Sequence, residues 1–483
     1  MADNDYPIAY AGFITSEEIR KKSSSGGVFS ALALYVLNAN GVVAGCALDR
    51  DMKAVHVIAE CEADLEPLRG SKYVQSHKGD IYTKVLEHLK LGSKVLFVGT
   101  PCECGGIKSL VDASGTDASQ LILCDFICHG VPSPMIFDSY LKNTEKKLND
   151  KITDYRFRLK DHGWNQSGLQ LGVRFETKNN NVVRRYPAYK DPFMCGFLED
   201  IYLRPSCYDC RFKTAKQDFC DITIADFWGI DKVDKTLNDG KGISLILAHN
   251  DKSQKMLEAI DDLALTRVDA MKALKGNKTI IKSAELPAER THFFKAYASK
   301  GYEYAEKKYM NTAKWVVKTS WRVLHRIIET VLERVFALAG IHLNERQLFV
   351  TGQFIQFCMV GVSNALVSYL LNISVITLTR PYGIKYDYMI ANVTAFVLSV
   401  LWSYHWNNRY VFAEGEEKRH KTRTLTKAYL TYAFSGIVLN NLLSTLWIGV
   451  LGLSKYIAPL LNIPFTMPVN FLISKFWTYR HDR

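Results

Sequence analysis

The pattern of hydrophobic and polar positions divides the chain into two parts. After Gln347, four long apolar segments follow one another, at about 349–378, 388–412, 428–453 and 457–479. Each reaches the ~20 residues with which a helix crosses ~30 Å of hydrocarbon. This pattern predicts an all-α domain of four transmembrane helices. Before it, apolar runs alternate with polar segments, as expected of a water-soluble α/β (α+β) domain.

Polar side chains interrupt the four apolar segments. They are Gln353, Gln356, Asn364, Asn372, Asn392, Ser399, Ser403, His405, Asn440, Asn441, Asn462, Asn470 and Lys475. Polar groups are costly in lipid, so we expect these side chains to face the interior of the helix bundle or a polar path. Two interpretations stay open. The side chains either join helices by hydrogen bonds without a role in transport, or line a path for a polar ligand.

The loop charges predict the orientation of these helices. The second connection, residues 414–427, contains the basic residues Lys418, Arg419, Lys421, Arg423 and Lys427. The first connection has Arg380 and Lys385, and the third has only Lys455. The positive-inside rule therefore places the second loop in the cytoplasm and, with four spans, both termini as well. The first twenty residues have no apolar core, so no signal peptide is expected. The expected location is the inner (cell) membrane, multi-pass, with the N-terminal domain and the C-terminus cytoplasmic.

The charge of the chain follows the same division. Residues 346–483 hold 13 basic and 5 acidic side chains, so most of the net +12 lies in the apolar part. A basic chain can indicate nucleic-acid binding, but the sequence has no Lys/Arg-rich patch interleaved with aromatic residues. Basic cytoplasmic loops are typical of membrane proteins. We therefore expect membrane lipid as a partner and no nucleic acid.

A single connecting helix is predicted over residues 311–340. Four basic residues recur at every fourth position: Lys314, Lys318, Arg322 and Arg326. Apolar residues form a band beside them. Such a helix either lies in the headgroup layer of a membrane or packs on a domain with its charged face in water. Its position before the apolar segments favours the membrane interface. The predicted domains are residues 1–305, 306–345 and 346–483.

In the front part, strands and helices are predicted in alternation. The segment Ser23–Gly27 begins a helix, and a strand follows Gly41. Further strands are predicted at 54–59, 94–98 and 121–126, then three antiparallel strands at 152–160, 168–177 and 181–189, while residues 265–310 are taken as helical. Small residues at a helix start expose N–H groups that bind anions such as a nucleotide phosphate. Ordinary serine N-capping is the alternative, and from these residues alone it is the better explanation.

Ten of the eleven cysteines lie in the first 220 residues. In the cytosol, clustered thiols indicate metal or redox chemistry more often than disulfides. Cys102 and Cys128 each follow a predicted buried strand, and ligands of α/β sheets bind beyond the carboxyl ends of strands. Cys207 and Cys210 form a C-x-x-C pair, which suits zinc or an iron–sulfur cluster. One such pair needs further ligands, for which Cys102 and Cys128 are the candidates. Unliganded thiols are the alternative.

The front part resembles the beta subunit family of coenzyme F-420 hydrogenases and dehydrogenases. The shared motifs are Ser24-Ser25-Gly26-Gly27, Gly70-Ser71-Lys72-Tyr73, Gly99-Thr100-Pro101-Cys102, Cys128-His129-Gly130-Val131-Pro132-Ser133, Cys207-x-x-Cys210 and Asp221-Ile222-Thr223-x-x-Asp226-Phe227-Trp228-Gly229. They occur in this order over about residues 20–260. The resemblance implies FAD and a 4Fe–4S cluster, with electrons moving between the cluster, the flavin and a deazaflavin or other acceptor.

The same resemblance implies roles for individual residues. The cluster ligands are Cys102, Cys128, Cys207 and Cys210, with Cys220 as a spare. The flavin contacts are Ser24, Ser25, Gly26, Gly27, Gly70, Ser71, Lys72, Tyr73 and Thr100. Lys72 would neutralise a phosphate or the charge of a reduced flavin. Asp226 is either structural or orients cofactor groups. The resemblance assigns no catalytic residue.

The apolar part resembles the GtrA-like family through two motifs. They are Phe357-Cys358-Met359-Val360-Gly361 and Asn407-Asn408-Arg409-Tyr410-Val411-Phe412. The halves also repeat, since Phe357-x-x-x-Gly361 matches Tyr432-x-x-x-Gly436 and Arg409-Tyr410-Val411-Phe412 matches Phe476-Trp477-Thr478-Tyr479. The fourth segment departs from the family pattern, because Lys475-Phe476-Trp477-Thr478-Tyr479 stands where N-R-x-W-x-F is usual. The family is associated with cell-surface polysaccharide synthesis and with moving polyprenyl-phosphate-linked sugars across membranes.

Together the two resemblances imply a membrane-tethered flavin and iron–sulfur oxidoreductase of cell-surface polysaccharide biosynthesis. Its membrane domain would anchor the enzyme or translocate a polyprenyl-phosphate-linked sugar, and glycan-assembly enzymes would be its partners. One alternative is a non-catalytic scaffold or polysaccharide-export membrane protein with a structural front domain. Another is a respiratory electron-transfer subunit. The absence of a two-cluster ferredoxin insert weighs against the respiratory alternative.

Overall fold

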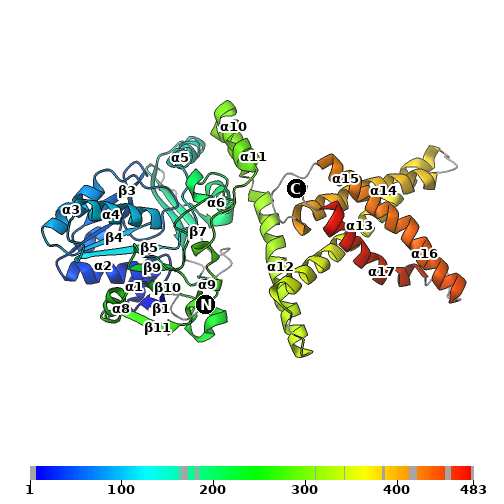
Figure 1. Cartoon of the computed structure of the whole chain (residues 1–483). Coiled ribbons are helices and arrows are strands. Elements are labelled where there is room, and N and C mark those ends of the chain that lie inside the picture. The colour runs from blue at the N-terminus through cyan, green and yellow to red at the C-terminus, as the bar shows by residue number, and fades with distance from the viewer. Residues whose placement is uncertain are drawn as a thin grey trace. The chain divides into compact units, whose positions relative to one another are not determined.

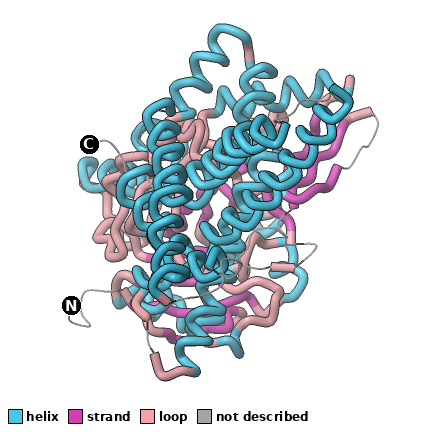
Figure 2. Tube along the Cα trace, turned by 90° about the vertical axis from the view of Figure 1, so that its right-hand side faces the viewer, coloured by secondary structure: helices cyan, strands magenta, loops and turns pink. Residues whose placement is uncertain are grey.

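The chain forms two compact units, Met1–Trp315 and Val316–Arg483. A computed structural model of the chain describes residues 7–160, 163–164, 172–179, 184–310, 312–341, 343–382, 387–412, 421–451 and 458–479. Figure 1 follows the chain through both units by colour. Every strand of the described residues, magenta in Figure 2, precedes residue 269 and belongs to the front unit.

An eight-stranded mixed sheet forms the centre of the front unit, in the order β11-β1-β10-β9-β5-β4-β2-β3. Its strands are β1 (Ile8–Ile14), β2 (Val42–Leu48), β3 (Ala54–Ala59), β4 (Val95–Gly99), β5 (Leu121–Phe126), β9 (Ile222–Asp226), β10 (Ser244–Ala248) and β11 (Leu263–Val268). The central strands β2, β4, β5 and β9 run parallel. Strand β3 pairs antiparallel at one edge, and β10, β1 and β11 continue the sheet antiparallel at the other.

Helices cover both faces of this sheet. Helices α2 (Val28–Asn38) and α8 (Asp251–Glu258) bury Leu32 and Leu257 against one face. Helices α3 (Ile81–Lys90) and α4 (Pro101–Ser114) bury Val85 and Ile107 against the other. Figure 1 shows α3 and α4 on the side of the central strands opposite α2. Since both faces are buried, β4 and β5 consist of nearly continuous apolar residues. The predicted α/β fold of the front domain is confirmed.

A second, smaller sheet packs beside the first within the front unit. It contains the antiparallel strands β6 (Ile152–Leu159), β7 (Gly172–Thr177) and β8 (Arg184–Pro187), as predicted, although residues 168–171 and 181–183 lie outside the described residues. Its core is rich in aromatic rings shared with α5 (Pro134–Leu148), α6 (Pro192–Leu198), α10 (Glu289–Lys300) and α11 (Tyr302–Tyr309). Three short helices complete the unit, α1 (Glu17–Lys22), α7 (Ile230–Val233) and α9 (Ala270–Lys275).

Two expectations about local structure were wrong. The helix expected from Ser23 begins at Val28, because Gly27 takes the N-cap position with φ +83°, in the left-handed region. The serines before it do not cap this helix. Residues 265–268, expected to be helical, belong to β11, which pairs antiparallel with β1 at the sheet edge. Pairing with β1 satisfies the backbone N–H and C=O groups of these residues. The local sequence alone does not predict a strand here, because strand formation depends on the neighbouring strand.

The second unit is helical. It contains all but the first turn of α12 (Thr312–Leu338), followed by α13 (Glu345–Thr379), α14 (Asp387–Trp406), α15 (Lys421–Ala433), α16 (Asn440–Thr445) and α17 (Ala458–Ile473). Helix α12 is the predicted connecting helix. By length and composition, one helix of the described residues, Arg346–Tyr382, suits a membrane span. The helical C-terminal region is thus confirmed, and the arrangement of four transmembrane helices stays a prediction. Of the loop residues that predict its orientation, Lys385, Lys418, Arg419 and Lys455 lie outside the described residues.

Polar side chains join the helices of the second unit. Gln353 is buried, donates from Nε2 to the carbonyl of Val411 at 3.0 Å, and accepts from Lys475 Nζ at 2.8 Å. The hydroxyls of Ser403 and Tyr432 lie 2.7 Å apart. These contacts fit the interpretation that polar side chains hold the helices together.

Candidate functional site

The four cysteines that the sequence selects as ligands line one pocket beyond the carboxyl ends of β4 and β5. Cys102 lies in the first turn of α4, and Cys128 follows β5 by two residues. Cys207 and Cys210 come from the segment after α6. The pocket is lined by Thr100, Pro101, Cys102, Phe126, Ile127, Cys128, His129, Gly130, Val131, Cys207, Cys210, Phe212, Lys213, Gln217, Thr279 and Ile280. Three separate segments thus bring the four thiols together.

Hydrogen bonds within the chain itself define the first turn of α4. Thr100 is its N-cap and Pro101 is its first residue. This position suits proline, because a backbone N–H there would have no hydrogen-bond partner within the helix. The backbone N–H of Thr100 donates to Glu103 Oε2 at 2.8 Å, and the Thr100 hydroxyl lies 3.2 Å from Cys102 Sγ. Glu103 is in turn paired with Lys78. A hydrogen bond to a ligand sulfur is one of the means by which proteins tune iron–sulfur clusters.

Burial and one cation set the electrostatics of the pocket. Burial raises the pKa of the Cys128 thiol to about 12, and the ammonium of Lys213 acts in the opposite direction. Burial also raises the pKa of Cys207. Lys213 Nζ donates to the carbonyls of Cys128 and, at 2.6 Å, Thr279. These two thiols are therefore protonated at neutral pH, and a metal ion that bound them would have to displace the protons.

The residues present fit an iron–sulfur cluster by their chemistry. Thiolates are the ligands that such clusters take, and four of them line the pocket. A positive side chain, Lys213, lies beside them. Among the described residues, no group of three or more Cys, His, Asp or Glu side chains is already arranged around a metal position. The ligand role of the four cysteines therefore stays a prediction.

The residues predicted to contact flavin form two neighbouring loops. The hydroxyl of Ser24 accepts from the backbone N–H of Ser71 at 2.9 Å and lies 3.0 Å from the Ser71 hydroxyl. Ser25 donates to the carbonyl of Ile243 at 2.8 Å. Gly26 lies so close to β1 that an added Cβ would stand 2.5 Å from the Gly12 carbonyl oxygen. The serines thus anchor loops to each other and to the sheet.

Lys72 and Tyr73 point in different directions within the second loop. Lys72 Nζ donates to the carbonyls of Pro67, Leu68 and Arg69, and burial lowers its pKa to about 8. Tyr73 stacks on Phe197 with centroids 4.8 Å apart. Phe197 in turn meets the edge of His129, a pocket residue, at 5.2 Å. Ring contacts therefore connect the Gly70–Tyr73 loop to the cysteine pocket, which Thr100 also lines.

Three family models match the chain. The coenzyme F420 hydrogenase/dehydrogenase beta subunit N-terminal model matches residues 9–80, and the model of its C terminus matches residues 92–273. The GtrA/DPMS transmembrane domain model matches residues 356–479.

The chain belongs to the coenzyme F420 hydrogenase/dehydrogenase beta-subunit family, with a GtrA/DPMS transmembrane domain fused behind it.

A solved structure is also similar to this beta-subunit-like chain. It is a chain of the xenon-derivatised F420-reducing [NiFe] hydrogenase complex from Methanosarcina barkeri. The two are 16% identical, the match covers 57% of this chain and 90% of that chain, and the TM-score is 0.38. A comparison with curated proteins finds no match.

The beta-subunit domain also holds residues that the sequence analysis did not select. Lys213 follows Cys210 by three residues and is the ammonium of the pocket. Gln217 lines the pocket and is 4% exposed. Asp125 is fully buried in β5. An acidic residue inside an otherwise apolar strand is the sequence signal that marks Asp125, since buried carboxylates need a partner.

Asp226, in the motif of residues 221–229, is paired with side chains of its own domain. It pairs with Arg158, whose Nη2 lies 2.7 Å from Oδ1, and it accepts from Trp164 Nε1 at 2.9 Å. Trp164 stacks on Trp228 with centroids 5.2 Å apart. These contacts favour the structural alternative for Asp226 over a direct cofactor contact.

Proposed function

We propose that this chain is a membrane-tethered flavin and iron–sulfur oxidoreductase of cell-surface polysaccharide biosynthesis. The observation that carries the proposal is the meeting of Cys102, Cys128, Cys207 and Cys210 in one pocket, from three segments of the front unit. A structural core thiol has no reason to collect at the ligand-binding end of a parallel sheet. The match to the family of F420 hydrogenase and dehydrogenase beta subunits supports redox chemistry.

In this proposal the four cysteines hold a 4Fe–4S cluster, and Ser24–Gly27, Gly70–Tyr73 and Thr100 contact FAD. When bound, the cluster passes single electrons and the flavin exchanges one or two. The chain's own residues shape both places. Thr100 bonds Cys102 Sγ, Lys213 supplies positive charge, and Tyr73, Phe197 and His129 fill the space between the loops and the pocket with rings.

The membrane unit anchors the enzyme or translocates a polyprenyl-phosphate-linked sugar. The match to the GtrA/DPMS transmembrane domain supports a membrane location. Helix α13 exposes an apolar surface that includes Val362, Leu366 and Tyr369, as expected where lipid is the solvent. In this proposal the unit has four spans, the front domain and the C-terminus are cytoplasmic, and glycan-assembly enzymes are the partners.

The test is an anaerobic absorption spectrum of the purified full chain in detergent, with iron, zinc and flavin counted per chain. We expect flavin bands, a broad iron–sulfur shoulder and about four iron atoms. Cys207→Ser should remove the shoulder and most of the iron. Cys61→Ser is the matched control, because Cys61 is exposed and does not line the pocket.

The opposite result of this experiment would contradict the proposal. If the purified chain is colourless, contains zinc or no metal, and has the same spectrum and metal content after Cys207→Ser, the pocket cysteines have only a structural role. The membrane unit would then be the functional part, and the front domain a scaffold.

A further inference from the structure

A group of exposed lysines lies beside the cysteine pocket. Residues 270–284 contain four lysines and no acidic residue, whereas residues 1–345 as a whole hold 48 basic and 44 acidic side chains. All four are exposed, and they are Lys272, Lys275, Lys278 and Lys282. Lys282 pairs with Glu285, but among the described residues no carboxylate forms an ion pair with the other three. Positive charge therefore collects here, in a domain whose charges otherwise nearly balance.

Packing places these lysines on the outer side of their segment. Helix α9 and the short 3₁₀ turn Lys278–Ile280 bury Ala273, Leu274 and Ile280 in the core of the front unit. The lysines alternate with these buried positions, so one side of the segment faces the core and the other carries the charge. Met271 and Ile281 accompany the lysines and are 49% and 62% exposed. The outer side is thus both basic and partly apolar.

The same segment contacts the loop that holds Cys210. Thr279 and Ile280 line the cysteine pocket. The carbonyl of Thr279 accepts a hydrogen bond from Lys213 Nζ at 2.6 Å. The hydroxyl of Ser283 accepts one from the backbone N–H of Cys210 at 3.0 Å. The exposed lysines therefore border the place where a cluster is predicted to bind.

A surface of this kind suits a large anionic partner better than a small anion. The lysines are exposed and belong to successive turns, so they do not enclose a small ligand. Clustered positive charge attracts an acidic protein from a distance and raises its association rate by about 10- to 1,000-fold. Exposed apolar side chains between the charges supply contacts that lose water on docking. Electron-transfer partners dock weakly, through small interfaces of this type.

We propose that Met271, Lys272, Lys275, Lys278 and Ile281 form the docking surface for a small acidic electron-carrier protein that reduces the four-cysteine site. The proposal rests on the proposed function. In this step one electron passes from the reduced carrier to the oxidised cluster. The carrier is oxidised by one electron, the cluster is reduced by one, and no bond forms or breaks.

The first experiment follows the oxidation of a reduced plant-type ferredoxin, a small acidic [2Fe–2S] protein, by the full chain in non-ionic detergent. We expect its second-order rate constant to fall as ionic strength rises, because salt screens the attraction. The triple variant with Lys272→Glu, Lys275→Glu and Lys278→Glu should lower the rate constant at least about tenfold at low salt and remove this salt dependence. An unchanged rate constant overturns the proposal.

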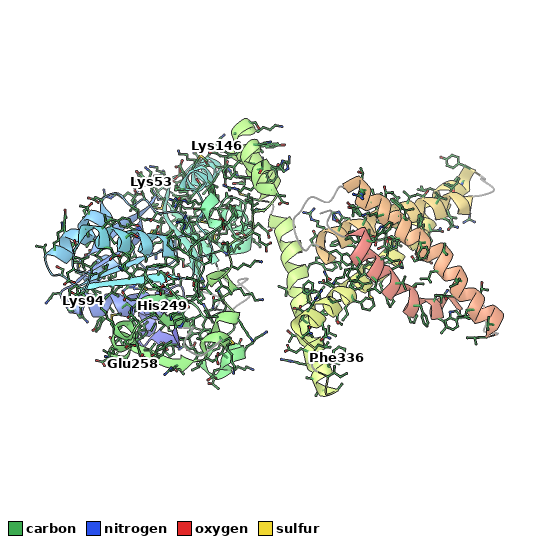
Figure 3. All side chains as sticks on the ribbon, in the orientation of Figure 1. Lys53, Lys94, Lys146, His249, Glu258 and Phe336 are labelled. Atoms are coloured by element: carbon green, nitrogen blue, oxygen red, sulfur yellow. The ribbon has the colours of Figure 1, made fainter. Side chains whose placement is uncertain are left out.

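The matched control makes the same change of charge elsewhere on the front unit. It combines Lys53→Glu, Lys90→Glu and Lys146→Glu, and these three lysines are also exposed. Lys53 and Lys146 are labelled in the upper part of the front unit in Figure 3, whereas α9 lies in its lower half in Figure 1. The control should keep most of the parent's rate constant. An equal loss in both triple variants would mean that net charge alone attracts the carrier, and it overturns the proposal.

Binding of the oxidised ferredoxin distinguishes a failure of docking from a failure of the proposed function. The Kd, measured by fluorescence anisotropy of dye-labelled ferredoxin, does not require a cluster in the chain. It should be at least about tenfold higher for the triple variant of Lys272, Lys275 and Lys278, whether or not the chain holds iron. Equal Kd values for this variant and the parent overturn the docking surface even if the cluster is present.

Anionic membrane lipid also attracts basic surfaces. The full chain is therefore placed in nanodiscs of neutral or of anionic lipid, and the acetylation of its lysines by an N-hydroxysuccinimide ester is read by mass spectrometry. Protection of Lys272, Lys275 and Lys278 by oxidised ferredoxin in neutral nanodiscs supports the proposal. Protection by anionic lipid alone, with none from ferredoxin in neutral nanodiscs, would mean that the surface binds the membrane, and it overturns the proposal.

Discussion

The rings of Phe412 and Tyr479 stack with their centroids 4.9 Å apart and their planes 13° from parallel. Each ring ends one half of the internal repeat of the membrane unit. The backbone N–H of Phe412 bonds the carbonyl of Asn407 at 2.8 Å, and that of Tyr479 bonds the carbonyl of Ser474 at 2.8 Å. Both halves therefore close with the same wide π-helical turn. The sequence repeat that ends at these two residues is also a structural repeat.

We expect Phe412→Ala to destabilise the membrane unit. Phe412 is buried and also contacts Phe357 and Phe471. Removing a buried ring costs about 3–5 kcal/mol in soluble cores, and less where lipid replaces water as the solvent. Thermal unfolding in detergent should show a lower midpoint for Phe412→Ala. Phe434→Ala, which removes a ring that is 47% exposed, should stay close to the parent. Equal decreases of the unfolding midpoint in both variants would mean that the stack of Phe412 on Tyr479 adds no stability beyond that of an exposed ring.

A second prediction concerns the ammonium beside the cysteine pocket. Lys213→Met should move the reduction potential of a bound cluster to more negative values, because a nearby positive charge stabilises the form that holds the extra electron. Lys213→Arg keeps the charge and should restore most of the potential. Lys216→Met removes an exposed lysine three residues on and serves as control. The reduction potentials of these variants are measured by a redox titration followed by absorption. Identical potentials for Lys213→Met and the parent contradict the prediction.

The parts of the site that were predictable from sequence depend on short-range signals. Cys102 and Cys128 follow strands whose apolar runs are easily recognised, and Cys207 and Cys210 are three residues apart. The relation of Asp125 to Thr223 was not predictable, because only the parallel pairing of β5 with β9 brings these two residues together. Polar partners of this kind depend on tertiary packing, not on local periodicity.

The fold shows the same limit at the edges of the sheet. The parallel strands β2, β4 and β5 were predicted, since burial on both faces leaves continuous apolar runs. Strand β1 was not predicted, and its neighbour β11 was taken as helix. Both run antiparallel at one side of the sheet, where the pairing partner rather than the residue pattern decides the structure. The hydrogen bond between Ser24 and Ser71 likewise joins two loops that lie far apart in the sequence.

A third prediction concerns the pH dependence of stability. His56 stacks on Phe97, and its Nδ1 lies 2.7 Å from the Ser76 hydroxyl. Burial lowers the pKa of His56 to about 4, although Glu103 acts in the opposite direction. The unfolded chain binds a proton at His56 below about pH 6.5, whereas the folded chain does so only below about pH 4. Folding stability should therefore rise with pH over this window, by at most about 3 kcal/mol from this group.

His56→Gln should flatten that rise. The comparison must be made between variants, because His249 contributes in the same direction and Asp125 in the opposite one over a similar range. The measurement is the unfolding midpoint of the front unit within the full chain, by fluorescence, at several pH values between about 4.5 and 7. The prediction fails if parent and His56→Gln show parallel profiles.

The last prediction concerns the exposed side of α12. Ile327, Val331, Val335 and Leu338 are each at least 53% exposed and recur at three- and four-residue spacing, so they form one apolar stripe along the helix. An amphipathic helix of this kind, next to the apolar helix Arg346–Tyr382, is expected to lie in the headgroup layer. Tryptophan placed on the stripe, as Val331→Trp, should then be shielded from water. Tryptophan at the exposed neighbour, as Glu333→Trp, should not be.

The measurement compares the full chain in lipid vesicles with and without brominated acyl chains, which quench tryptophan fluorescence on contact. The native tryptophans contribute the same background to both variants, so the difference in quenching isolates the added residue. Stronger quenching of Val331→Trp than of Glu333→Trp would place the stripe against lipid. Equal quenching of the two variants would mean that the apolar stripe does not contact the acyl chains. Helix α12 would then pack against protein as an ordinary domain helix, with its charged face in water.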